Sequence, residues 1–201
     1  RGMEKLSTQH IYTLLRILGL FMLDTIAPPD PLVRRIEMMT TAEYMSAVKK
    51  DIQDSNKSLM PSAILAYKDP LVKTAVLEIK SYGNKKLALL LGSVLYTHLC
   101  AVLAPNPSLQ KPLIIPIPIT RKSLRARGWN QCELILHGFK TADVHNLFEA
   151  RTDILYKVRE TADQVGKNRQ ERFKNLKHSF MVKNPEKISG RTVIVFDDIL
   201  T

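Results

Sequence analysis

The feature that most constrains the fold is a short apolar run ending in two adjacent carboxylates, VIVFDD at residues 193–198. Four consecutive apolar residues are typical of a strand buried on both faces, as the strands of a parallel sheet are. Ligands of such sheets bind at the carboxyl ends of the strands. Asp197 and Asp198 stand at that end. The pattern alone leaves two interpretations open: the carboxylates simply terminate the strand, or they belong to a ligand site.

Strand and helix patterns alternate along the rest of the chain. Apolar periodicity and the positions of Pro and Gly predict helices over 1–24, 32–50, 70–81, 85–103, 128–140 and 166–176. They predict strands over 113–115, 153–158 and 193–196, and a basic loop over 121–127. We therefore expect an α/β fold, a three-layer sandwich with a mainly parallel sheet, preceded by an N-terminal helical segment. The domains expected are 1–57, helical segment and linker, and 58–201, the α/β domain.

Composition narrows the class of partner and the location. The 30 Lys and Arg against 19 Asp and Glu give a net charge of +11, which favours a polyanionic partner, either nucleic acid or a phosphorylated small molecule. Cys100 and Cys132 are too few for a disulfide framework and lack zinc-ligand spacing, so a reducing, cytoplasmic location is expected. The apolar stretch 11–27 is interrupted by Arg16 and Asp24, which predicts an amphipathic docking helix and no membrane span.

Two basic segments precede the acidic pair. Residues 115–131, IPIPITRKSLRARGWNQ, combine a strand end, a proline-stiffened loop and several guanidinium groups, whose planar forks match phosphate oxygens. Residues 159–175 place Arg169 and Arg172 three positions apart on one face of a predicted helix. Either segment alone would also suit a solvated basic surface.

Taken together and in this order, the segments resemble the ComF family of competence-associated proteins, whose cores resemble type I phosphoribosyltransferases. The resemblance covers about residues 60–201. It includes EIKSYGN at 78–84, the Pro-Ile-Pro loop, Arg-Gly-Trp-Asn-Gln at 127–131 and the Arg-x-Thr-x-x-Gln spacing at 159–164, followed by Arg172, Asn175 and Phe180. Many family members carry an N-terminal zinc ribbon of paired Cys-x-x-Cys motifs. This region has no cysteine here, so no zinc is expected, and Trp129 replaces the usual Phe.

The resemblance implies a glycosyltransferase that binds phosphoribosyl pyrophosphate (PRPP) with Mg²⁺ and transfers the sugar to an acceptor that the motifs do not identify. The acidic pair would hold the ribose hydroxyls. The implied site residues are Asp197 and Asp198 as the catalytic pair and, for PRPP and phosphate, Pro116, Pro118, Arg125, Arg127, Asn130, Gln131, Gln164, Lys167, Arg169, Arg172 and Thr201.

Within that set, the resemblance implies a division of roles. The loop 116–120 with Arg125 and Arg127 would face pyrophosphate, and Gln164, Lys167 and Arg169 would lie on a flap that closes over the substrate. The family continues with a phosphate-binding loop of which Thr201 is the first part. The chain is therefore expected to be a C-terminally incomplete, inactive domain with an exposed sheet edge.

The charge, the motifs and the resemblance are compatible with two functions from different classes. The first is a phosphoribosyltransferase. The second is a non-catalytic accessory of DNA uptake, in which the basic surface binds single-stranded DNA or a helicase-like partner. A purely structural basic domain would leave the acidic pair and the ordered motifs unexplained.

Overall fold

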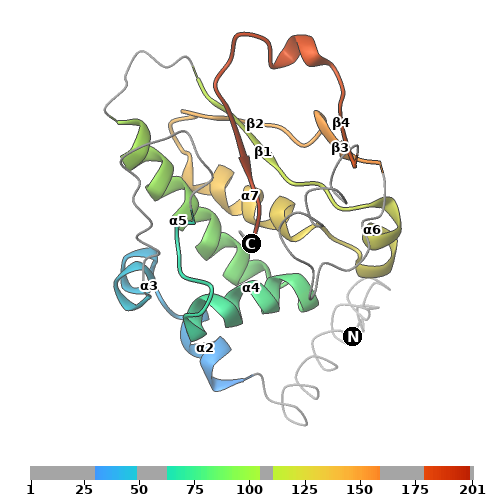
Figure 1. Ribbon diagram of the computed structural model, residues 1–201. Coiled ribbons are helices and arrows are strands. Elements are labelled where there is room, and N and C mark those ends of the chain that lie inside the picture. The colour runs from blue at the N-terminus through green and yellow to red at the C-terminus, as the bar shows by residue number, and fades with distance from the viewer. Residues whose placement is uncertain (1–29, 49–62, 105–110, 159–178, 200–201) are drawn as a thin grey trace, which may run out of the picture.

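The computed structural model describes residues 30–48, 63–104, 111–158 and 179–199 (Figure 1). The helices predicted at 1–24 and 166–176 lie outside these ranges. In chain order, the described elements are α2 (Pro31–Glu37), α3 (Thr41–Ala47), α4 (Pro70–Tyr82), α5 (Lys85–Leu103), β1 (Leu113–Pro116), α6 (Arg121–Arg127), α7 (Gln131–Ala142), β2 (Glu149–Ala150), β3 (Leu155–Lys157), β4 (Phe180–Val182), the 3₁₀ helix η1 (Pro185–Lys187) and β5 (Val193–Phe196).

A small parallel sheet lies at the centre of this mixed α/β fold. Its strands are ordered β2-β1-β5, and all pair in parallel. Leu113 of β1 lies opposite Val193 of β5, and Pro116 lies opposite Phe196, so the two strands begin and end together. The predicted strand at 153–158 is shorter, and its place is different. As β3 it pairs antiparallel with β4 in a separate two-stranded sheet.

The helices α4, α5 and α7 cover one face of the parallel sheet (Figure 1). Ile114 points into this side and is fully buried. The helices α2 and α3 add Val33, Ile36 and Tyr44 to the same core. The apolar periodicity of α4 and α7 and the nearly continuous apolar sequence of α5 account for this packing, because each helix presents a wide apolar stripe to its neighbours.

The closest helix contact is the crossing of α5 and α7, where each helix carries a glycine. A Cβ atom built on Gly138 would lie 2.6 Å from the carbonyl oxygen of Ala88 and from the Cα of Leu89. A Cβ on Gly92 would collide with the backbone of Ile135, Gly138 and Phe139. The two backbones can therefore approach this closely only because both positions lack a side chain.

The opposite face of the sheet is covered less completely. Leu113 and Ile115 point to this side and pack with Ile154 in a small second cluster. The side chains of Val193 and Val195 in β5 are 36% and 51% exposed. The prediction that the final strand is buried on both faces is therefore wrong. Exposed and partly buried side chains alternate along β5, which indicates that only one face of the strand is covered. Its four consecutive apolar residues had suggested that both faces are covered.

Two predicted segments differ in their local structure. The single helical stretch expected over 32–50 is interrupted before Thr40, which starts a new helix with a capping box: its Oγ1 accepts from the Glu43 N–H at 3.2 Å, and Glu43 Oε2 accepts from the Thr40 N–H at 2.7 Å. The basic loop expected over 121–127 is the helix α6. Thr120 caps it by accepting a hydrogen bond from the Ser123 N–H at 3.1 Å, and Gly128 ends it in the left-handed conformation.

Among the described residues, α5 is long and apolar enough to cross a membrane. The core helix of a soluble protein meets the same criterion. In this fold Leu87, Leu91, Val94 and Leu95 of α5 are buried in the core. The criterion therefore does not assign α5 to a membrane. The stretch 11–27, for which no membrane span was predicted, lies outside the described residues.

Candidate functional site

The acidic pair lies at the carboxyl edge of the parallel sheet, beside the proline loop. The parallel register ends β1 at Pro116 and β5 at Phe196, and the Ile117 N–H donates to the Phe196 carbonyl at 2.9 Å. Pro116 and Pro118 therefore lie next to the chain segment that leads into Asp197. The structure brings these two predicted segments together because adjacent parallel strands end at the same edge.

The first turn of α7 forms the third side of this site. Asn130 caps the helix, since its Oδ1 accepts from the Cys132 N–H at 3.0 Å. The Asn130 amide donates to the Ile117 carbonyl at 3.0 Å and to Glu133 Oε1 at 3.3 Å, so it joins the proline loop to α7. The amide oxygen and the amide nitrogen of Asn130 therefore both form hydrogen bonds within the chain. These bonds fix the proline loop against the first turn of α7.

A buried thiol lies against the acidic pair. Cys132 is 1% exposed, and its Sγ donates to Asp197 Oδ1 at 3.5 Å. Asp197 Oδ1 also accepts from the Asp198 N–H at 2.8 Å. Burial and the two nearby carboxylates raise the pKa of the Cys132 thiol well above its usual value, so this group stays protonated at neutral pH.

The environment makes the two carboxylates unequal. Asp197 is exposed, whereas Asp198 is partly buried, and Asp198 Oδ2 accepts no hydrogen bond from the described residues. Burial, together with the hydrogen bond and negative charge of Asp197, raises the pKa of Asp198 to about 6. Lys80 and the Gln131 amide act in the opposite direction and favour the charged form. At neutral pH Asp198 is therefore mainly an anionic oxygen ligand, with part of its population protonated.

The donor set at this edge fits a hard cation. The Sγ atom of Cys132 and one carboxylate oxygen each of Asp197 and Asp198 all lie within 4.8 Å of one another. The carboxylate oxygens of this set are donors of the kind that Mg²⁺ prefers.

A basic hollow lies beside the acidic pair, between the end of α4 and α6. It has a volume of about 490 Å³ and is lined by Lys80, Ser81, Ser123, Ala126, Arg127 and Trp129. Arg127 Nη1 donates to Gln131 Oε1 at 2.8 Å, which connects the wall of the hollow to the first residue of α7. We call this feature the α4–α6 cavity.

The predicted site residues divide into three groups. Asp197, Asp198, Pro116, Pro118, Asn130 and Gln131 meet at the sheet edge, and Arg127 reaches it through Gln131. Arg125 is exposed on α6. The remaining predicted residues, Gln164, Lys167, Arg169, Arg172 and Thr201, lie outside the described residues.

Sequence reasoning missed Cys132 and Lys80 at this site. Cys132 touches a residue 65 positions later in the chain, and no local pattern marks such a contact. Lys80 is part of the EIKSYGN segment, which was noted only as a motif. Its position at the end of an amphipathic helix was the available signal that its side chain lies at the edge of the core.

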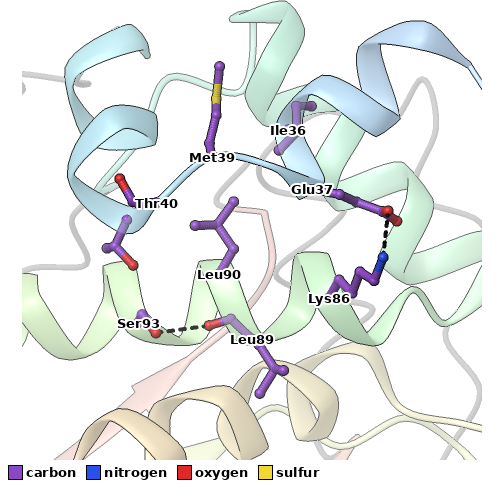
Figure 2. Close-up of a pocket in the computed structure, with 9 residues that line it drawn as sticks. Ile36, Glu37, Met39, Thr40, Lys86, Leu89, Leu90 and Ser93 are labelled. Atoms are coloured by element: carbon purple, nitrogen blue, oxygen red, sulfur yellow. Dashed lines mark hydrogen bonds and ion pairs between the residues drawn. The ribbon is translucent and has the colours of Figure 1, made fainter.

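A second hollow, of about 380 Å³, lies between the α2–α3 connection and α5 (Figure 2). Figure 2 shows its charged groups paired with each other: Lys86 Nζ lies 3.3 Å from Glu37 Oε2. The Asn84 amide also donates to Glu37, at 2.7 Å. Met39 and Leu90 supply apolar lining. With its charges already neutralised, this hollow lacks the converging polar groups of a binding site.

Comparison of the chain with protein-family models, with curated proteins and with solved structures gave no match.

Proposed function

We propose that this chain is a phosphoribosyltransferase-like protein of the ComF type, which binds PRPP with Mg²⁺ at the acidic pair. The proposal includes a three-layer type I phosphoribosyltransferase-like architecture, a cytoplasmic location and an association with DNA uptake. The observation that carries it is the position of Asp197 and Asp198 at the carboxyl edge of a parallel sheet, beside the Pro-Ile-Pro loop and the first turn of α7.

The inequality of the two carboxylates supports separate roles. Exposed Asp197 can accept hydrogen bonds from a ribose diol, and the Cys132 thiol holds the Oδ1 atom of this carboxylate from behind. Asp198 has a buried oxygen without a partner among the described residues, which is suited to a ligand hydroxyl. When bound, Mg²⁺ would supply positive charge against the pyrophosphate leaving group.

The pyrophosphate side would be formed by the loop 116–120 and the cations of α6. Loss of pyrophosphate leaves positive character on the anomeric carbon and negative charge on the departing oxygen. Arg127 is held near the site by Gln131, whereas exposed Arg125 lies half a turn earlier and therefore on another side of the same helix. The Arg127 guanidinium would stabilise the developing negative charge, so the chain needs no protein nucleophile for this reaction.

The decisive experiment is calorimetry of PRPP binding, with and without Mg²⁺, to the wild-type protein and to its Asp197→Asn and Asp198→Asn variants. We expect each substitution to weaken Mg²⁺-dependent binding at least about tenfold, because each removes a charged acceptor of hydrogen bonds. Glu186→Gln is the matched control, since it removes one carboxylate from the exposed helix η1. Unchanged Mg²⁺-dependent binding in both aspartate variants would contradict the assignment.

The alternative function, a DNA-uptake accessory, is favoured by the net charge of +11 and by the exposed cations Arg121, Lys122 and Arg125 on α6. Single-stranded DNA binding should then weaken steeply as salt concentration rises, because neutralised phosphates release counterions. Steep salt dependence without any PRPP binding would favour this function over the enzyme.

A further inference from the structure

The α4–α6 cavity combines cationic groups with an aromatic wall. Lys80 and Arg127 line it from two different helices, and none of its lining residues is acidic. No carboxylate among the described residues forms an ion pair with Lys80. The second hollow in Figure 2 has an acidic residue, Glu37, in its lining, whereas the carboxylate that interacts with Lys80, Asp198, lies outside the lining of this cavity. The lining of the α4–α6 cavity therefore favours an anion.

Trp129 provides a fixed aromatic surface in this cavity. Its Nε1–H donates to the Ile79 carbonyl at 3.0 Å. One part of the ring lies against Gly83, where an added Cβ would be 3.0 Å from Cε2 of the indole. Gly83 has a φ of +64°, and it both ends α4 and leaves room for the ring. A ring held in this way can stack on a planar ligand without losing further conformational freedom on binding.

The cavity is also connected to the acidic pair. Arg127 binds Gln131, and Gln131 and Lys80 both act on Asp198. A ligand in the cavity would consequently lie beside the residues proposed to hold the ribose. A volume of about 490 Å³ is sufficient for a single substituted ring.

We propose that the α4–α6 cavity binds the acceptor of the sugar, and that this acceptor is a planar ring carrying a carboxylate or a phosphate. The inference rests on the proposed function. Lys80 would bind the acidic group, Trp129 would stack on the ring, and the hydroxyls of Ser81 and Ser123 would offer further hydrogen bonds.

The transfer is a simple displacement. A nucleophilic atom of the acceptor donates its lone pair to the anomeric carbon of PRPP. The bond from that carbon to the pyrophosphate oxygen breaks, and pyrophosphate leaves with the electron pair. A proton on the nucleophilic atom passes to solvent.

Trp129 is the only tryptophan of the chain, so its fluorescence reports directly on binding in the cavity. We would titrate the protein with benzoate and with phenyl phosphate while recording tryptophan fluorescence, with benzamide as the uncharged control. Saturable quenching by one or both anions, and none by benzamide, is the expected result. The tighter of the two anions identifies the acidic group. Absence of saturable quenching by both anions would overturn the proposal.

Two lysine variants separate a specific site from the general positive charge. Lys80→Met should weaken binding of the tighter probe at least about tenfold, whereas Lys73→Met, which removes an exposed lysine from the same helix, should change it less than about twofold. Both variants keep Trp129 as the reporter. Equal weakening in the two variants would indicate nonspecific attraction and would contradict the assignment of the cavity.

Calorimetry of the wild-type protein with PRPP and Mg²⁺ distinguishes this inference from the proposed function. PRPP binding, together with probe binding that depends on Lys80, is the expected result. PRPP binding without probe binding overturns the acceptor site alone. Probe binding that depends on Lys80, in a protein that does not bind PRPP, overturns the proposed function and the acceptor role, and leaves a binding site for an aromatic anion.

Discussion

The two faces of the parallel sheet differ in how they are covered. On one side, α5 and α7 approach backbone to backbone at Gly92 and Gly138, and Ile114 is buried in the large core. On the other side, Leu113 and Ile115 share a small cluster with Ile154, while much of β5 faces solvent. The difference indicates that the helix side holds the fold together. The acidic pair directly follows β5, whose side chains point alternately to the helix side and to the open side.

The largest expected effect is on the helix side. Gly92→Ala should lower the free energy of unfolding by about 3 kcal/mol, because its Cβ would meet backbone atoms of α7, which cannot move aside as a flexible side chain can. Urea unfolding monitored by circular dichroism measures the change. Thr97→Ala, at an exposed position of the same helix, is the control and should shift stability by less than about 0.5 kcal/mol. If the two variants were equally stable, the close crossing of α5 and α7 would not hold the fold.

A pair of adjacent substitutions in β5 compares the two faces directly. Ile194 packs against the large core, whereas Val195 is 51% exposed on the opposite face. Ile194→Thr should cost about 1–2 kcal/mol because it buries a hydroxyl and removes apolar contact, and Val195→Thr should stay within about 0.5 kcal/mol. Both variants keep a β-branched residue. Equal losses, measured by urea unfolding, would show that the second face is also a buried core surface.

The smallest effect concerns ion pairs beside the open face. Arg151 makes two hydrogen bonds to Asp153, at 2.7 and 2.6 Å, which hold the pKa of that carboxyl well below its usual value. Arg191 similarly lowers the pKa of Glu149, with a contact at 2.7 Å. Because the folded-state pKa values are depressed, this stabilisation is present above the usual carboxyl pKa and is lost as the pH falls below about 4.

Comparing urea midpoints at about pH 7 and about pH 3 tests this contribution. The wild type should lose more stability over this interval than Arg151→Gln, in which the Asp153 carboxyl has no guanidinium to hold it charged. Arg35→Gln, which removes an exposed arginine from α2, should retain the wild-type acid sensitivity. If Arg151→Gln and the wild type respond equally to acid, the pairs do not contribute. The expected difference is small because exposed ion pairs are screened by solvent.

Local sequence signals predicted much of this structure. The helices α4 and α5 and the strands β1 and β5 lie where periodicity, Pro70 and Gly83 placed them. The helix predicted over 128–140 is α7, which begins at Gln131 because Gly128 ends α6 and Asn130 caps α7. The helix α6 was missed because its basic residues have no apolar period, although Thr120 and Gly128 supplied both caps. The strand β2 has only two residues and pairs with β1 through the backbone, so no side-chain pattern marks it.

The candidate site could be predicted only in part. Asp197, Asp198 and the proline loop were recognisable because a strand and the residues at its end are adjacent in sequence. That they meet depends on β1 and β5 being neighbours in register. The contributions of Cys132, Lys80 and the α4–α6 cavity come from three separate segments of the chain, which no local pattern relates to one another.

The sequence by itself determined the helices and strands with strong periodicity, the basic charge and the carboxylates at the end of the last described strand. These properties depend on neighbouring residues and on composition. Only the tertiary structure decided which face of β5 is covered, how closely α5 and α7 approach, and which cations lie beside the carboxylates. These depend on contacts between residues far apart in the chain, and the free energy of such contacts is set by packing and burial that no single segment contains.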